Sequence, residues 1–190
     1  PGAGRTTTVR FRADRLHREG ERLVFVDFKT GRVPAGLDAK TEETRHEHLL
    51  AGVRSGQRLQ AALYALSVAP RAADARYHFL APDDDPPERS IGLAGDDETS
   101  AALRAGATTL LDALRLGLHP PRLLDAKLEQ EYAGCEYCAV AEACVQRDSG
   151  FRLRLERWHA HEAARDGRRR EREEALWKLW RLPAREEPER

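Results

Sequence analysis

Two aspartates and a lysine near the start of the chain have the types and spacing of a hydrolytic metal site. Asp27 and Lys29 follow the apolar run 23–26, and alternation along a strand puts their side chains on one face. A hairpin turn at residues 19–21 can bring Asp14 beside Asp27. Two converging carboxylates suit Mg²⁺ or Mn²⁺, and the adjacent ammonium can stabilise charge on a phosphate. The alternative is a surface ion pair, but the apolar run leading into Asp27 favours a site at the rim of a sheet.

A second group of candidate ligands is the cysteine cluster Cys135-x2-Cys138-x5-Cys144. Three clustered cysteines do not suit a disulfide framework, so they indicate metal ligation in a reducing cytoplasm. The spacing leaves two centres open, Zn²⁺ and an iron–sulfur cluster, and both need a fourth ligand. That ligand is a cysteine absent from this sequence unless His119, His159 or His161 supplies it.

Gln60 and Tyr64 lie one turn apart on a predicted helix over residues 57–69, so they share a face. Both side chains can reach a phosphate or a base. The alternative is a helix whose apolar face includes a tyrosine.

The elements that must position these residues follow from hydrophobic periodicity. We expect an α/β fold with a central mixed sheet of about four strands flanked by helices. The expected domains are a core over 1–134, the cysteine motif over 135–150, and an Arg- and Glu-rich helix and tail over 151–190. The predicted strands are 5–12, 22–28, 75–81 and 88–93, and the predicted helices are 41–54, 57–69, 97–117 and a single long helix over 151–182.

Composition excludes several classes of protein. The 190 residues include 32 basic and 32 acidic side chains, and the zero net charge excludes both a polycation that coats nucleic acid and an acidic disordered chain. No apolar run approaches the roughly 18 residues of a membrane span, and no signal peptide is evident. The chain has no Met and begins with Pro, so we expect a piece of a longer protein.

Together and in this order, the motifs resemble the RecB/AddB-type nucleases of the PD-(D/E)XK superfamily. That family has a Gly-x-x-Asp-Arg-x-Asp strand, then Asp-Tyr-Lys-Thr-Gly, then Gln-x-x-x-Tyr on a helix. Its AddB-like and CRISPR-associated RecB-like members then carry Cys-x2-Cys-x5-Cys near the C-terminus. Residues 11–17, 27–31 and 59–64 are the counterparts here. Two positions depart from the pattern, because Phe11 replaces a glycine and His17 replaces a second aspartate.

The resemblance implies a restriction-endonuclease-like PD-(D/E)XK core with a catalytic Mg²⁺ or Mn²⁺. Asp14, Asp27 and the backbone carbonyl of Phe28 would bind the metal ion. Lys29 would be the catalytic lysine.

The resemblance also assigns roles to the remaining motifs. Gln60 and Tyr64 would shape the DNA path and support the site. Cys135, Cys138 and Cys144 would hold a [4Fe–4S] cluster, with the fourth cysteine upstream of this sequence and Zn²⁺ as the alternative metal.

The implied function is that of a nuclease domain in an AddB-like subunit of a bacterial helicase–nuclease, acting in double-strand break repair. It would be a Mg²⁺- or Mn²⁺-dependent exonuclease acting on DNA, with a helicase domain or subunit as partner. The alternatives are a CRISPR-associated RecB-like exonuclease, a non-catalytic DNA-binding scaffold of the same fold, and a zinc-stapled module. The length of chain after Cys144 argues against the first alternative.

Overall fold

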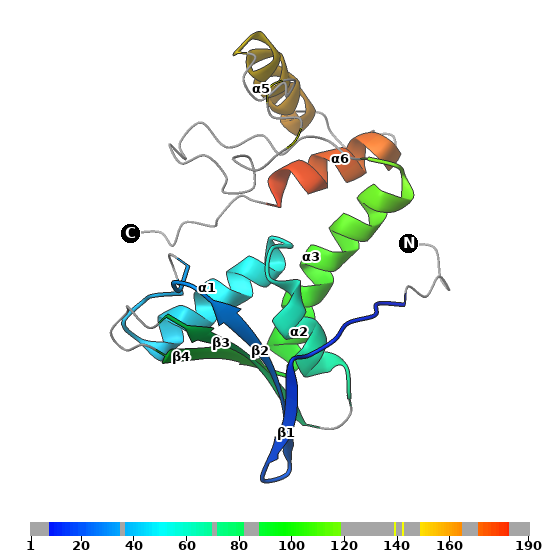
Figure 1. Cartoon of the computed structure of the whole chain (residues 1–190). Coiled ribbons are helices and arrows are strands. Elements are labelled where there is room, and N and C mark those ends of the chain that lie inside the picture. The colour runs from blue at the N-terminus through cyan, green and yellow to red at the C-terminus, as the bar shows by residue number, and fades with distance from the viewer. Residues whose placement is uncertain are drawn as a thin grey trace. The chain divides into compact units, whose positions relative to one another are not determined.

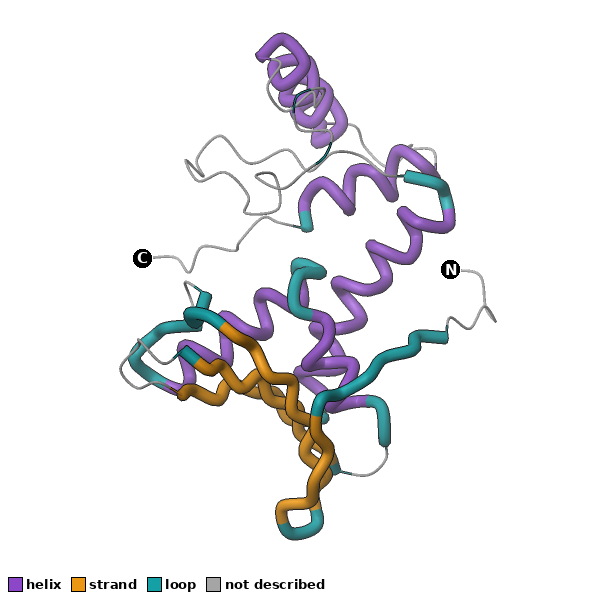
Figure 2. Tube along the Cα trace, in the orientation of Figure 1, coloured by secondary structure: helices purple, strands orange, loops and turns teal. Residues whose placement is uncertain are grey.

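The computed structural model separates the chain into two compact units whose boundary lies between Ala107 and Thr108. Figures 1 and 2 show the elements of each unit. The residues described are 8–34, 37–69, 72–81, 88–118, 139, 142, 149–164 and 171–182.

A mixed four-stranded sheet forms the centre of the first unit, as the sequence predicts. The strands lie side by side in the order β1-β2-β3-β4. A tight turn at Gly20, whose φ of 61° suits glycine, joins β1 to β2 as an antiparallel hairpin. Strands β2 and β3 are parallel, and β3 and β4 are antiparallel. The bounds are Arg15–Glu19 for β1, Arg22–Thr30 for β2, Ala73–Leu80 for β3 and Glu88–Ala94 for β4.

Two helices connect β2 to β3, because parallel neighbours need a crossover rather than a hairpin. They are α1 (Glu42–Arg54) and α2 (Leu59–Leu66), and α3 (Asp97–Arg115) follows β4. The second unit contains α5 (Ser149–Ala164) and α6 (Glu171–Arg181). None of the helices in the described residues is long and apolar enough to span a membrane.

The starts of α1 and α3 are fixed by short polar side chains. Thr41 accepts a hydrogen bond from the Thr44 backbone N–H at 3.2 Å, and Asp96 accepts one from Thr99 at 2.8 Å. Each caps an amide that has no partner inside its helix. Helix α2 differs, because its N-cap residue Arg58 makes no such side-chain bond.

One face of the sheet packs against α1 and α2 (Figure 1) and carries the core. Helix α2 contacts β2, β3 and β4, while α1 contacts β4. The strand register aligns the buried side chains in rows, so that Phe25 of β2 lies beside Ala75 of β3 and Leu93 of β4. The next row along contains Asp27, Tyr77 and Ile91. A carboxylate therefore lies at the end of an apolar row.

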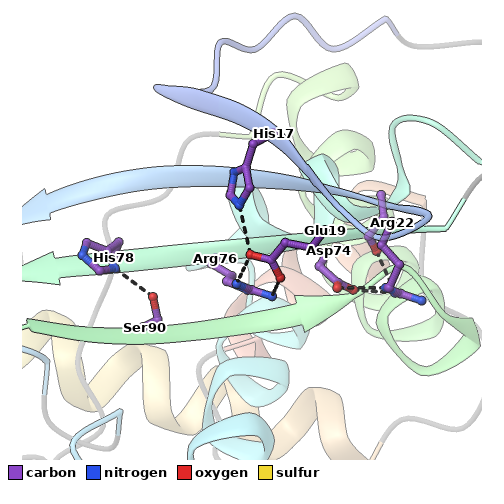
Figure 3. Close-up of polar contacts among 8 residues, drawn as sticks. His17, Glu19, Arg22, Asp74, Arg76, His78 and Ser90 are labelled. Atoms are coloured by element: carbon purple, nitrogen blue, oxygen red, sulfur yellow. Dashed lines mark hydrogen bonds and ion pairs between the residues drawn. The ribbon is translucent and has the colours of Figure 1, made fainter.

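The opposite face is held by cross-strand polar contacts (Figure 3). Arg76 of β3 reaches across β2 and donates two hydrogen bonds to Glu19 of β1, at 2.9 and 2.7 Å. Arg22 of β2 likewise makes a bidentate pair with Asp74, which lies on the neighbouring strand β3, with 2.9 Å between Nε and Oδ2. Val24, on this face of the intervening strand, is fully buried. These bidentate pairs tie three strands together.

Two predicted elements differ from the structure. Residues 8–13, part of the strand predicted over 5–12, are not in a strand, and the strand begins only at Arg15. At Arg12 the carbonyl accepts a hydrogen bond from the Tyr64 hydroxyl of α2 and not from a neighbouring strand. In place of one helix over 151–182 the structure has α5 and α6, and residues 165–170 between them lie outside the described residues.

The Glu19–Arg76 pair makes the stability of the first unit sensitive to acid. Hydrogen bonds from Arg76 and His17 lower the pKa of Glu19 from 4.5 to about 2. Because the folded-state pKa is depressed, the pair stabilises the protein fully above pH 4.5, and this contribution is lost as the pH falls through about 2. We expect Glu19→Gln to unfold at lower urea concentration at pH 7, and the difference to shrink as the pH approaches 2. A difference that stays constant with pH would contradict the assignment.

Candidate active site

Asp27 is the buried charged residue around which the candidate site is arranged. It follows the apolar run of β2 and is only 5% exposed, because alternation directs its side chain toward the helices together with that of Phe25. Its Oδ1 accepts a hydrogen bond from Gln60 Nε2 at 2.7 Å. Its Oδ2 is buried and lies 2.5 Å from Lys29 Nζ. The carboxylate is thus held between an amide and an ammonium.

Lys29 joins the buried carboxylate to the protein surface. Its Nζ also lies 3.3 Å from Gln60 Oε1 and 5.4 Å from the centre of the Tyr77 ring. The side chain is 41% exposed, in contrast to 8% for that of Asp27. An ammonium in this position is anchored on one side and accessible to a phosphate on the other.

Helix α2 supplies the polar partners of the site. Gln60 donates to Asp27 and also to the Tyr64 hydroxyl at 2.6 Å, which uses both N–H groups of its amide. The Tyr64 hydroxyl in turn donates to the Arg12 carbonyl at 2.6 Å. Tyr64 is only 1% exposed and packs against Phe11, with ring centres 4.9 Å apart. Gln60 and Tyr64 lie on one face of α2, as their spacing predicts, and the structure also links both to Asp27 while burying Tyr64.

Asp14 lies just before β1, at the same end of the sheet as Asp27. Arg15 pairs with Val26, so continuing the register by one residue sets Asp14 across from Asp27. Its Oδ2 accepts a hydrogen bond from the Phe28 backbone N–H at 2.9 Å. The predicted hairpin therefore brings the two carboxylates to one edge of the sheet, although Asp14 precedes the strand instead of following it.

The backbone of Phe28 faces Asp14, whereas its ring lies on the face of the sheet opposite to Asp27. Its N–H points toward Asp14, and in a strand the carbonyl of a residue points the same way as its N–H. The Phe28 carbonyl therefore faces the edge where β1 has not yet begun. The ring is on the opposite face, 40% exposed, with its centre 5.5 Å from that of His78.

The residues present fit a hard divalent cation. Asp14, Asp27 and the Phe28 carbonyl belong to the same edge of the sheet, and carboxylate and carbonyl oxygens are the ligands of Mg²⁺ and Mn²⁺. Asp27 Oδ2 is paired with the Lys29 ammonium, and an ionised carboxylate oxygen has a second lone pair with which it can bind a cation. No group of three or more His, Cys, Asp or Glu side chains that could hold a metal occurs among the described residues, so a backbone carbonyl would complete the donor set.

His17 lies on the polar face of the sheet and contacts Glu19 at 3.0 Å (Figure 3). Cys135, Cys138, Cys144 and His119 lie outside the described residues.

Tyr77 was not predicted as a site residue. Its ring lies under Lys29, and its hydroxyl accepts a hydrogen bond from the Ala61 backbone N–H at 3.2 Å. Burial raises the pKa of Tyr77 above 10, so the hydroxyl is neutral at physiological pH. The available signal was its place on the predicted strand over 75–81, but its pairing with Asp27 depends on the register of a parallel strand distant in sequence.

A mixed sheet with helices on the face that carries Asp-x-Lys defines an α/β fold of the restriction-endonuclease-like class. The sequence profile of the PD-(D/E)XK nuclease superfamily matches residues 4–145. The match spans more than half of the chain, and the chain therefore belongs to this superfamily. Neither the curated proteins nor the solved structures compared with the chain gave a match.

Proposed function

We propose that the chain hydrolyses DNA phosphodiester bonds with the help of a Mg²⁺ or Mn²⁺ ion. The observation that carries this proposal is the buried carboxylate of Asp27, contacted by Lys29 and set across from Asp14, in a member of a nuclease superfamily. Isolated buried carboxylates are costly, and a cluster of this kind at a sheet edge suits a reaction centre.

In this proposal Asp14, Asp27 and the Phe28 carbonyl hold the cation. When bound, it would supply Lewis-acid stabilisation of phosphate charge and lower the pKa of a coordinated water. Lys29 donates to the phosphate from its exposed side while Gln60 keeps its ammonium close to Asp27. Tyr64, being buried, acts through Gln60 and Arg12 and does not touch the substrate.

Exposed arginines near Asp14 support DNA as the substrate. Arg10, Arg12 and Arg15 are all exposed, and they flank Asp14 in the sequence. Guanidinium groups pair well with phosphates, and phosphate contacts supply most of the sequence-independent affinity for DNA. The overall neutral charge means that such binding is local to this edge.

Loss of cleavage in charge-neutral variants tests the proposal. End-labelled linear DNA is incubated with the full chain and Mg²⁺, Mn²⁺ or EDTA. We expect Asp14→Asn, Asp27→Asn and Lys29→Met each to lower the cleavage rate at least about a hundredfold, because each removes a group that acts on the transition state. The matched control is Asp112→Asn, which changes a half-exposed carboxylate of α3 and should cleave at the wild-type rate.

Two outcomes contradict this reading. Wild-type cleavage by Asp27→Asn would overturn the site assignment. DNA binding that persists in EDTA, without cleavage in Mn²⁺, would instead indicate a non-catalytic scaffold. Covalently closed circular DNA in the same assay tests exonuclease action, because an exonuclease requires an end and leaves the circle intact.

We further propose that the chain is the nuclease domain of an AddB-like helicase–nuclease of double-strand break repair in the bacterial cytoplasm. The order of the motifs supports this context, since the Asp14, Asp27-x-Lys29 and Gln60-x3-Tyr64 motifs are followed by the cysteine cluster. A helicase domain or subunit would supply the DNA end. Co-purification of the native full-length protein with a helicase tests the partnership.

The cysteine cluster is proposed to hold a [4Fe–4S] centre with a fourth cysteine from elsewhere in the protein. Three thiolates within one short segment support a shared metal centre, but their spacing also suits Zn²⁺. We expect the complete protein, purified without oxygen, to be brown and to contain iron and acid-labile sulfide. A colourless protein with stoichiometric zinc would overturn the cluster and leave the nuclease proposal intact.

A further inference from the structure

Tyr77 contacts one partner of Asp27, Lys29, and the residue that follows the other partner, Gln60. It is directly across from Asp27 in the β2–β3 register and is only 4% exposed. Its ring lies 5.4 Å from Lys29 Nζ, within the range of a cation–π interaction. Its hydroxyl reaches the first turn of α2, where it accepts a hydrogen bond from Ala61.

The bond to Ala61 replaces a missing helix cap. Ala61 is the third residue of α2, and its N–H is the one that an N-cap side chain ordinarily satisfies. Arg58 occupies the N-cap position with φ −123° and ψ 41°, outside the extended conformation usual there, and makes no capping bond. The phenol of Tyr77 supplies the acceptor from the neighbouring strand.

This bond also fixes Gln60. Gln60 immediately precedes Ala61 in the first turn of α2, and its amide holds the carboxylate of Asp27. Anchoring the turn to β3 sets the distance from Gln60 to β2. A helix of eight residues has few other bonds with which to resist fraying at that end.

We infer that Tyr77 is a positioning residue of the active site, which aligns Gln60 through the α2 cap and Lys29 through its ring. The kinetic consequences of this inference rest on the proposed nuclease function. The positions of Ala61 and Lys29 do not, and they can be measured without any DNA.

The test separates the hydroxyl from the ring in the full chain. Tyr77→Phe keeps the ring and removes the acceptor, while Tyr77→Leu removes both. Ile91→Val is the matched control. Ile91 is buried on β4 directly opposite Tyr77, but it is not part of the set of contacts that links Tyr77 to Lys29 and Ala61. Selective ¹³C labelling of lysine is practical, since the chain has only Lys29, Lys40, Lys127 and Lys178.

For Tyr77→Phe we expect about tenfold faster amide exchange at Ala61, an unchanged ring-current shift of the Lys29 ε-methylene, and a kcat about tenfold lower with KM within about twofold. For Tyr77→Leu the Lys29 shift should vanish and kcat should fall about a hundredfold. Ile91→Val should lower the urea midpoint but leave all of these values unchanged.

The positioning role would be overturned if the Ala61 exchange rate in Tyr77→Phe and the Lys29 chemical shift in Tyr77→Leu both stayed at their wild-type values. It would also be overturned if Ile91→Val changed the exchange rate, the shift and kcat as much as the Tyr77 variants do. If the wild-type chain cleaves no DNA with either metal, the proposed function fails. The Ala61 exchange and the Lys29 shift then still decide whether Tyr77 positions these groups.

Discussion

The burial of the Asp27 carboxylate is the constraint on which the rest of the first unit depends. Removing an unpaired carboxylate from water costs several kcal/mol, which is a large share of the stability of a small domain. The short contact with Lys29 and the hydrogen bond from Gln60 offset that cost, because hydrogen bonds to charged groups contribute about 1.5–3 kcal/mol each. Lys29 and Gln60 must therefore both be held close to Asp27. Lys29 is held there by β2 itself, and Gln60 by α2.

This requirement connects the fold to the chemistry. The crossover from β2 to β3 carries α2 over the face on which Asp27 lies, and Tyr64 extends the hydrogen-bonded chain to Arg12, two residues before Asp14. One connected set of bonds therefore runs from the central strand through the helix to the segment that carries the second carboxylate. A cation bound by Asp14 and Asp27 would compete with Lys29 for the Asp27 carboxylate. The Lys29 ammonium would then be more available to a phosphate.

Sequence patterns located most of these residues because the strongest signals are local. The apolar run leading into Asp27 predicted β2, and apolar residues at helical spacing over 57–69 predicted α2, although the ends of α2 lie inside that range. Strand β1 was misplaced because Arg15–Glu19 is a polar edge strand without apolar alternation, and its contacts to Arg76 come from distant sequence. Tyr77 was missed for the same reason, since its role arises from pairing with Asp27 across a parallel register.

The central claim is that Asp14 and Asp27 bind a divalent cation. It is tested most directly by titrating the full chain with Mn²⁺, with binding measured by calorimetry and by the electron paramagnetic resonance signal of the free ion. We predict saturable binding that is weakened at least about tenfold in Asp14→Asn and in Asp27→Asn, because each variant removes one charged ligand, while Asp112→Asn binds as the wild type does. Equal Mn²⁺ affinity in the wild type and both variants would contradict the assignment of these two carboxylates as the metal site.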